Sequence, residues 1–416
     1  MANETNGNGF FPMFRDVPAT GVIWVMGQAR LAGYAQDNSD WCNFGQGAPE
    51  TGPLPDAPER INQINIPHDD VHEYGPVAGV WEVREAVAAL YNQRYRVGKM
   101  PYTGKNVALC AGGRVALSRF FAILGDVNVG HVLPDYTAYD EGMNAWGTFS
   151  PSPIIGGHQT HRFDGQRFRS EVLERGLSAF VLSNPNNPTG KVLSGPTLHD
   201  WVRQAADLEC ALGMDEFYSH YIFEGPQRTV SAAEYVDDVN RDPVVVIDGI
   251  TKNWRYPGWR LAWTIAPEAV IERLANAGSF LDGGAPHPMQ LAALPLLDRT
   301  HADAEARAIQ VAFAEKRDAM VRGLRKLGLR LDAPKGSFYC WADTSPLPPG
   351  WNSGMGFFQK ALAAKVICVP GQFFDINPGK RRPNRGPLKD WVRISFGPEM
   401  SKLQQGLAQL EEAMGR

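Results

Sequence analysis

The sequence has none of the features that mark a membrane, secreted or zinc-binding protein. No apolar run reaches the roughly 18 residues that a membrane span needs, and the start of the chain lacks the basic segment and apolar core of a signal peptide. The five cysteines are scattered, odd in number and never spaced as CxxC, which excludes a disulfide framework and a zinc cage. We therefore expect a soluble, unprocessed protein in a reducing, cytoplasmic compartment.

The chain also lacks a strong excess of either charge. Its 45 acidic and 41 basic side chains leave a net charge of −4, and this near balance argues against nucleic acid as a partner. Hydrophobic residues at 44% and charged residues at 21% are ordinary values for a globular protein. At about 150 residues per domain, a chain of 416 residues predicts two or three structural units.

Short apolar runs alternate with helical patterns in the first two thirds of the chain. Helices are expected at 80–94 and 196–208, and a further helix opens at Gly112-Gly113. Strands are expected at 106–110, 129–133, 179–183, 244–248 and 261–265. This alternation predicts an α/β fold with a mostly parallel sheet that helices cover on both faces.

The remainder of the chain predicts a smaller α+β domain. A long amphipathic helix at about 302–327 leads into expected strands at 336–342, 366–369 and 391–396 and a closing helix at 400–414. The first 60 residues are rich in Gly, Pro and Asn and contain one short amphipathic stretch, which indicates an arm. The predicted division is 1–60 for the arm and part of the small domain, 61–315 for the large domain and 316–416 for the small domain.

Two loops at expected strand ends carry signals for ligand binding. AGGRVAL at 111–117 follows an apolar run and opens a helix, where free amide groups and the helix dipole favour a phosphate; a tight structural turn is an equally good interpretation of this motif alone. NPNNPTG at 184–190 follows another run, and its Asn187 amide is free to bond a ligand, although a Pro-rich turn would look the same.

Two further loops contain titratable groups. Asp215 and Tyr218 end a third apolar run. Asp215 is either a helix cap or the partner of the ring nitrogen of a pyridine cofactor. Tyr218 is either a packing residue or a donor to the 3-oxygen of that cofactor. Lys252 follows the run VVVID and precedes Arg260 by eight residues. A lysine at a buried strand end is costly unless it forms an imine, so Lys252 is either a Schiff-base lysine or a solvated loop lysine.

Taken together, these motifs resemble the class I/II aminotransferases, which are fold type I pyridoxal 5′-phosphate (PLP) enzymes. They occur in one order along the chain, with Arg-Ile-Ser-Phe following at 393–396. The resemblance runs from about Ala19 to the C-terminus. It includes GQGAPE at 45–50, YGPVAGVWEVREAVA at 74–88, PDYTAY at 134–139, KGSFYCW at 335–341 and VPGQFF at 369–374.

The resemblance implies a role for each matching residue. Lys252 would form the internal aldimine and act as a base, Asp215 would hold the pyridine nitrogen protonated, and Tyr218 and Asn187 would bond the 3-oxygen, which lowers the aldimine pKa. Arg393 would bind the substrate α-carboxylate through two hydrogen bonds, next to Gly47 and Asn187. The remaining expected contacts are Arg260 and the Gly113 and Arg114 amides with the phosphate, Tyr136 with the ring face, Trp24 with the substrate side chain, and Tyr74 with the phosphate of a second subunit in a homodimer. Gly249 stands where family members often have a phosphate-binding serine, so Thr251 or groups of a second subunit near 283–287 would help instead. The Arg114 guanidinium either reinforces phosphate binding or points to solvent.

Three features of the sequence leave alternatives open. His68 and His72 are spaced like metal ligands on a helix, but Pro67 and the acidic neighbours favour an exposed loop, and no metal is expected. The basic segment 379–389 is by default a solvated loop, or it covers the entrance to the site and attracts anionic substrates. Val22, Ile23 and Trp24 favour an apolar or aromatic substrate, although packing alone would also place them there.

The sequence therefore predicts a ping-pong aminotransferase that moves an amino group from an L-amino acid to a 2-oxo acid through Lys252. Elimination, replacement, cyclisation or oxidation of an amino acid on the same cofactor would leave the same lysine and arginine signatures. A PLP-sensing regulator is a third hypothesis, which the lack of a basic DNA-binding extension disfavours. No nucleic acid or membrane partner is expected.

Overall fold

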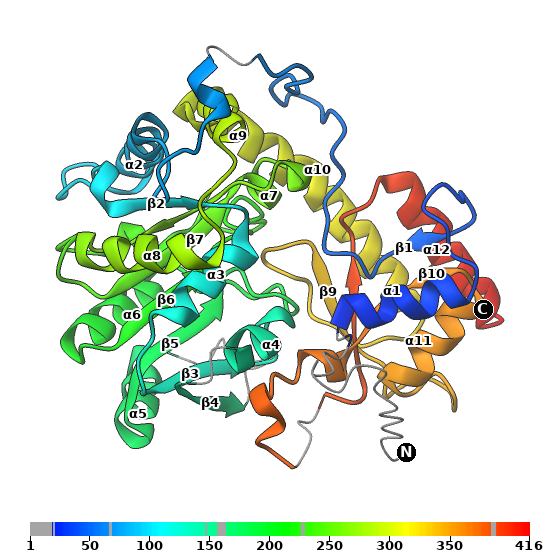
Figure 1. Ribbon diagram of the computed structural model, residues 1–416. Coiled ribbons are helices and arrows are strands. Elements are labelled where there is room, and N and C mark those ends of the chain that lie inside the picture. Colours follow the sequence, from blue (N-terminus) through cyan, green and yellow to red (C-terminus); the bar gives the residue numbers. More distant parts are fainter. Residues whose placement is uncertain are drawn as a thin grey trace, which may run out of the picture.

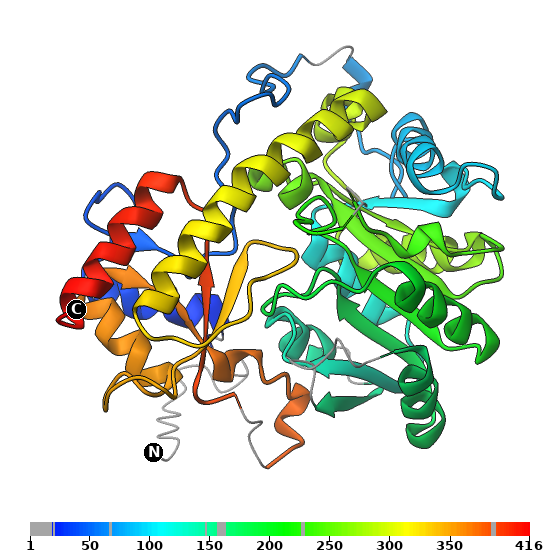
Figure 2. The ribbon, with the colours of Figure 1, turned by 180° about the vertical axis from the view of Figure 1, so that it is seen from behind.

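The computed structural model describes residues 19, 21–65, 69–145, 148–155, 164–225, 229–383 and 388–416. The chain forms a larger part, built around a sheet of seven strands, and a smaller part that contains both the first described helix and the last (Figure 1). The long helix α10 (Arg299–Lys326) runs from the larger part to the smaller one (Figure 2).

The central sheet is mostly parallel, as the alternation of strands and helices predicts. Its strands, in spatial order, are β2 (Val107–Cys110), β8 (Ala262–Ile265), β7 (Val244–Gly249), β6 (Ala211–Asp215), β5 (Leu177–Ser183), β3 (Asn128–Leu133) and β4 (Ser150–Ile155). Strand β8 is the exception, because it pairs antiparallel with both β2 and β7. The carboxyl ends of the other strands therefore lie along one edge of the sheet, where ligands of open α/β sheets bind.

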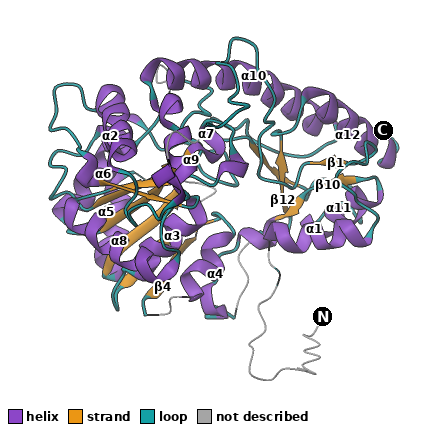
Figure 3. Cartoon of the chain, turned by 45° about the horizontal axis from the view of Figure 1, so that its top comes forward, coloured by secondary structure: helices purple, strands orange, loops and turns teal. Residues whose placement is uncertain are grey.

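Both faces of this sheet are buried beneath helices (Figure 3). In β7, Val245 and Ile247 belong to one apolar core, whereas Val244 and Val246 belong to the other, so successive side chains enter opposite cores. The helices of the larger part are α2 (Trp81–Tyr95), α3 (Gly113–Ala122), α4 (Ala138–Ala145), α5 (Gly165–Arg175), α6 (Gly195–Asp207), α7 (Ile250–Asn253), α8 (Glu268–Leu281) and α9 (His287–Ala292).

The smaller part joins the two ends of the chain. Strand β1 (Cys42–Asn43) pairs with β10 (Val366–Ile367), and a second sheet has the order β11 (Val369–Pro370), β12 (Trp391–Ser395) and β9 (Tyr339–Asp343). Its helices are α1 (Gly21–Leu31), α11 (Gly354–Ala363) and α12 (Met400–Ala413). The predicted domain boundaries at residues 60 and 315 stay a prediction.

Short 3₁₀ turns complete the secondary structure, at Asp69–His72, Gly104–Asn106, Ala232–Glu234, Pro257–Trp259, Leu294–Leu297, Gly371–Phe374 and Pro378–Lys380. All five cysteines are free and buried. Among the described residues, no helix has the length and apolar character that crossing a membrane requires.

Candidate active site

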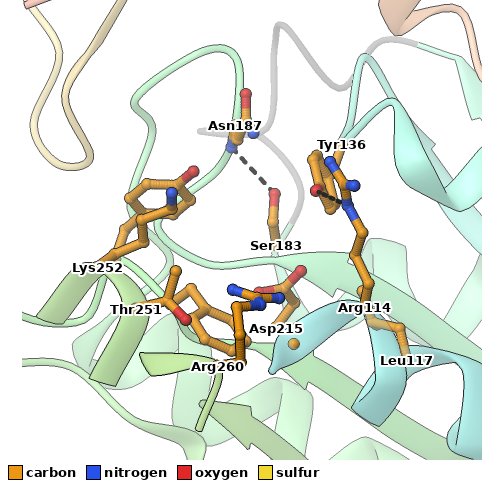
Figure 4. Close-up of a pocket in the computed structure, with 12 residues that line it drawn as sticks. Arg114, Leu117, Tyr136, Ser183, Asn187, Asp215, Thr251, Lys252 and Arg260 are labelled. Atoms are coloured by element: carbon orange, nitrogen blue, oxygen red, sulfur yellow. Dashed lines mark hydrogen bonds between the residues drawn. The ribbon is translucent and has the colours of Figure 1, made fainter. Parts of the chain in front are cut away.

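The loops that the sequence singles out meet in one cavity at the carboxyl edge of the central sheet. Ser183 at the end of β5 pairs in register with Asp215 at the end of β6, and β7 leads directly into Lys252. The cavity has a volume of about 330 Å³. In Figure 4, Lys252 and Thr251 lie on one side of it, Arg114 and Tyr136 on the other, and Asp215 between them.

Lys252 lies at this cavity on the short helix α7. Gly249 ends β7 immediately before that helix, and a Cβ there would lie 2.6 Å from the carbonyl oxygen of Leu261, so the close approach of β8 requires glycine. Burial, followed by the charges of Arg260, Arg393 and Arg114, lowers the pKa of the Lys252 ammonium to about 7. Its Nζ donates to the carbonyl of Gly47, and no carboxylate among the described residues pairs with it. Lys252 can therefore supply a neutral, nucleophilic amine near physiological pH.

Asp215 is a carboxylate on the floor of the cavity with no cationic partner among the described residues. It is 4% exposed, and Tyr139 on α4 donates a hydrogen bond of 3.0 Å to its Oδ2. Burial raises the pKa of Asp215 to about 6, although the hydrogen bond from Tyr139 opposes this shift. A protonated ring nitrogen next to this carboxylate would supply the missing positive charge.

The Asn-Pro loop is held by two buried side chains. Ser183 Oγ accepts from the backbone N–H of Asn187 at 3.0 Å, and it donates to Asp135 Oδ1 at 2.5 Å. Asp135 also accepts from the N–H of Tyr136 at 2.7 Å, so one carboxylate fixes the loop and the aromatic side chain together. The amide oxygen of Asn187 accepts from Arg393, which leaves its amide nitrogen as the donor toward a ligand.

The cavity also contains groups suited to a phosphate. Helix α3 begins after Gly112, at φ 90°, without a side-chain cap, which leaves the first amides of the helix open to an anion. The φ of Gly112 favours glycine, and a Cβ there would lie 2.3 Å from Arg260 Nη2, so this guanidinium lies close to the start of the helix. Thr251 Oγ1 is buried and has no hydrogen-bond partner in the described structure. A bound phosphate would satisfy these donors together.

Arg393 lies in the wider part of the same cleft, a space of about 640 Å³ that Lys252 also lines. It is 1% exposed and donates to Asn187 Oδ1 at 2.9 Å and to the carbonyl of Gly45 at 2.6 Å. Its Nε is buried without a partner, and no described carboxylate pairs with it. A buried guanidinium without an anion is costly, so this arrangement suits a carboxylate that arrives with the substrate.

Some predicted residues lie outside the cavity. Tyr74 is 100% exposed. Trp24 packs against the rings of Phe358 and Phe373 at centroid distances of 5.6 and 5.2 Å, whereas its neighbours Val22 and Ile23 line the cleft. The proposed contact of Trp24 with substrate stays a prediction.

Of the two segments for which alternatives stood open, no described residue lines either space. His68 lies outside the described residues, and no cluster of metal-ligating side chains occurs within them. In the basic segment, Lys380 pairs with Asp140 at 3.6 Å and Arg382 with Asp375 at 2.5 Å. Arg385 is outside the described residues. The described pairs favour a structural role for this segment.

Several residues of the site have no role in the sequence analysis. They are Leu117, Asp135, Tyr139, Ser183, Phe217 and Tyr339. Four of them stand within motifs that carry the family resemblance: Leu117 in AGGRVAL, Asp135 and Tyr139 in PDYTAY, and Tyr339 in KGSFYCW. Ser183 has a simpler signal, since it is a polar residue that ends a buried apolar strand.

Comparison with known proteins identifies the family. A model of the class I and II aminotransferases matches residues 39–410. The chain belongs to this family. It is 28% identical over 347 residues to the aspartate/prephenate aminotransferase of Thermus thermophilus, a match that covers 83% of this chain and 84% of the relative. It is 27% identical over 355 residues to the LL-diaminopimelate aminotransferase of Moorella thermoacetica, with the same coverage of 83% and 84%.

The chain has the same fold as solved structures of aminotransferases. The aspartate aminotransferase from Thermus thermophilus with maleate superimposes with a TM-score of 0.77 at 24% identity, over 96% of this chain and 100% of that chain. An aminotransferase from Mycobacterium tuberculosis gives the same TM-score of 0.77 at 24% identity, over 96% and 97% of the two chains. The predicted fold class, the fold type I architecture of the PLP enzymes, is therefore confirmed.

Proposed function

We propose that this chain is a PLP-dependent aminotransferase that moves an amino group from an L-amino acid to a 2-oxo acid in a ping-pong cycle, with Lys252 as the lysine that holds the cofactor. When bound, PLP supplies a reactive carbonyl carbon and an electron-accepting ring. The observation that carries the proposal is that Lys252, Asp215 and Arg393 meet in one cleft. Asp215 and Arg393 are buried and Lys252 is half-buried, and none of the three has an oppositely charged partner among the described residues.

Different residues of the cavity would bind the phosphate, the ring nitrogen, the 3-oxygen and the ring face of the cofactor. Arg260, Thr251 and the first amides of α3, at Gly113 and Arg114, would hold the phosphate. Asp215 would keep the ring nitrogen protonated, because each charge stabilises the other. The two donors to the 3-oxygen would be Tyr218 and Asn187, and Tyr136 would stack on the ring.

Lys252 and Arg393 would act on the substrate. Arg393 would bind the α-carboxylate with the paired geometry of a guanidinium and orient the substrate beside Gly47. Once released as a neutral amine, Lys252 Nζ would take the proton from the substrate Cα and deliver it to C4′, the carbon that the cofactor's carbonyl group supplies. The lowered pKa of Lys252, about 7, suits this proton transfer at physiological pH.

We further propose that the protein is a cytoplasmic homodimer with shared sites, and the exposure of Tyr74 supports the sharing of sites. A tyrosine that is 100% exposed gains no burial within its own chain. Placed against the phosphate of a partner subunit, its hydroxyl would complete the partner's site. Mixing Lys252→Ala chains with Tyr74→Ala chains should then restore activity, because each mixed dimer contains one intact site. Activity no higher than that of the separate variants would contradict shared sites.

A half-reaction screen tests the amino-transfer proposal directly. The PLP-loaded protein is mixed with one amino acid at a time, including aspartate, LL-diaminopimelate and aromatic and apolar amino acids, and the visible absorbance is followed. A donor should bleach the absorbance and release its 2-oxo acid in a 1:1 ratio to protein, and a second 2-oxo acid should restore the colour. Lys252→Ala is the control. Bleaching without recovery would contradict transamination.

The alternative outcomes on the same cofactor have distinct products. Elimination or oxidation would release ammonia, and cyclisation or replacement would retain the nitrogen in a new amino acid. Stoichiometric conversion of an added 2-oxo acid into its amino acid occurs only in transamination. This product analysis therefore separates the proposed function from its alternatives with one set of reactions.

A further inference from the structure

A tyrosine of the smaller part contacts the proposed cofactor-binding tyrosine of the larger part. Tyr339 lies on β9 and Tyr218 follows β6, and their hydroxyl oxygens are 2.7 Å apart. Both side chains are buried, Tyr339 completely. The hydrogen bond therefore crosses between the two parts of the molecule at the cavity itself.

Tyr339 also contacts the proposed carboxylate-binding arginine. The guanidinium carbon of Arg393 lies 4.3 Å from the centre of the Tyr339 ring, within the range of a cation–π interaction. On another side, a Cβ at Gly47 would lie 2.6 Å from the Tyr339 hydroxyl, so this glycine leaves the space that the hydroxyl occupies. Ring and hydroxyl are thus held by separate contacts, one toward Arg393 and one toward Tyr218.

The two phenols have enough protons to form a chain of hydrogen bonds. Burial raises the pKa of both Tyr218 and Tyr339 above the ordinary value, so each keeps its proton at neutral pH. The charged and titratable groups that influence this pair are Arg393, Tyr136 and Asp215. A phenol donates one hydrogen bond and accepts others, so Tyr218 can accept from Tyr339 while it donates its own proton to a ligand.

We propose that Tyr339 is a positioning residue that donates to the Tyr218 hydroxyl and thereby strengthens the hydrogen bond from Tyr218 to the 3-oxygen of the cofactor. Hydrogen bonds in a chain polarise one another, so a donor to the Tyr218 oxygen makes the Tyr218 proton a better donor. The same side chain packs on Arg393 and belongs to the smaller part. The position of the smaller part would therefore affect the charge on the 3-oxygen of the cofactor through Tyr339 and Tyr218. This inference rests on the proposed function.

The test is a pH titration of the visible absorbance of the PLP-loaded protein. Stabilising negative charge on the 3-oxygen lowers the pH at which the Lys252-bound chromophore loses its proton. Tyr339→Phe removes only the hydroxyl and should raise this midpoint by about half a pH unit, which is the scale of one hydrogen bond. Tyr218→Phe should raise the midpoint further, because it removes the direct donor.

A double variant shows whether Tyr339 acts through Tyr218. In the Tyr218→Phe background, Tyr339→Phe should give no additional shift, since the residue through which it acts is gone. Tyr95→Phe is the matched control: this phenol is also buried, lies on α2 and does not line the cavity, so the midpoint should equal that of the wild type. Tyr339→Met, which also lacks a donor and fills the space flexibly, gives a second test if Tyr339→Phe folds poorly.

Steady-state kinetics provides a separate readout. Tyr339→Phe keeps the ring beneath Arg393, so KM for the amino donor should change by less than about twofold, while kcat falls about three- to tenfold. A midpoint that is unchanged in both Tyr339→Phe and Tyr339→Met would overturn the inference. So would a double variant in which Tyr339→Phe adds the same shift as it does in the wild type. Either result would leave the proposed function intact. A wild-type protein that forms no chromophore with PLP would overturn both.

Discussion

Two pairs of cations in this molecule differ in whether a carboxylate lies beside them. Where α10 meets the loop after β1, Arg255 pairs with Glu305 at 2.7 Å and Lys316 pairs with Glu50 at 2.5 Å. In the cleft, Arg393 is buried and Lys252 is half-buried, but no described carboxylate pairs with either of them. Both regions join the smaller part to the larger one, and within the described residues only the first has its own counterions.

The difference separates structural cations from functional ones. Leaving a buried charge without a partner costs folding free energy, so a chain selected for stability alone would pair it or replace it. Arg255 and Lys316 follow that rule. Arg393 departs from this rule because it stays charged and can bind an incoming anion. Lys252 departs from it because its pKa is lowered to about 7, so that much of it is neutral at physiological pH.

The two lysines provide the largest expected contrast. Lys252→Ala should reduce amino transfer by at least about 10⁴-fold, because it removes the attacking amine and the base together. Thermal unfolding of the cofactor-free protein should change little. Lys316→Ala should keep kcat in the folded fraction and lower the melting temperature, since it leaves Glu50 unpaired. Steady-state rates and melting curves on both variants check this, and a Lys252→Ala protein with measurable turnover would contradict it.

The two arginines give the next contrast. Arg393→Gln should lower kcat/KM about 10²- to 10³-fold, the value of two charge-assisted hydrogen bonds, with a nearly normal melting temperature. Arg255→Gln should instead cost about 3–5 kcal/mol of stability, because Glu305 stays buried without its main partner. Arg393→Lys, which keeps the charge but not the paired geometry, should fall between wild type and Arg393→Gln. Denaturant unfolding and kinetics are measured on the same preparations. A stability loss in Arg393→Gln together with a loss of kcat/KM in Arg255→Gln would contradict this prediction.

Arg114 sharpens the comparison, because it lies at the cavity, is exposed and pairs with no described carboxylate. Its Nε donates to the Tyr136 hydroxyl at 3.3 Å. Arg114→Ala should raise the dissociation constant of PLP about tenfold, since one cation near the phosphate and the support of Tyr136 are lost together. Arg203→Ala, which removes an exposed cation that pairs with Asp237, should leave PLP binding unchanged. Equal affinities in the two variants would place Arg114 outside the phosphate site.

The pH dependence of cofactor capture gives the smallest expected change. The amine must be neutral to attack the carbonyl of PLP, and a pKa lowered to about 7 predicts the pH range in which it becomes neutral. The capture rate of the cofactor-free protein should rise about fivefold from pH 6 to pH 7 and level off above pH 8. Stopped-flow absorbance measures this rate. A rate that still rises steeply between pH 9 and pH 10 would indicate an ordinary, solvated lysine.

Most elements of the sheet follow from the sequence, and the exceptions have local causes. The strands expected at 129–133 and 244–248 form within one residue of those bounds. Strand β4 was missed because it contains Pro151 and Pro153, which only an edge position tolerates, and β4 is an edge strand. The strand expected at 336–342 begins only at Tyr339, because Ser337 has a φ of 58° and interrupts the extended backbone.

The candidate site was predictable where a residue has chemistry of its own and unpredictable where it acts through another. Lys252, Asp215 and Arg393 stand in recognisable motifs, and the structure places all three at one cleft. Asp135 and Tyr339 support Ser183 and Tyr218 across large separations in the chain, 48 and 121 residues. Such contacts depend on strand order and on how the two parts of the chain meet, which local patterns do not encode.

The pairing of the chain's two ends has a consequence for biosynthesis. Glu50 donates its N–H to the carbonyl of Gly397, and Arg393 donates to the carbonyl of Gly45, so these contacts of the early segment form only after the last strand is made. While the ribosome adds the intervening residues, the sheet of the larger part can already fold, but the cleft cannot close. A nascent chain halted before residue 391 would therefore carry the lysine without the arginine, and the ability to recognise a carboxylate would arise only in the final steps of translation.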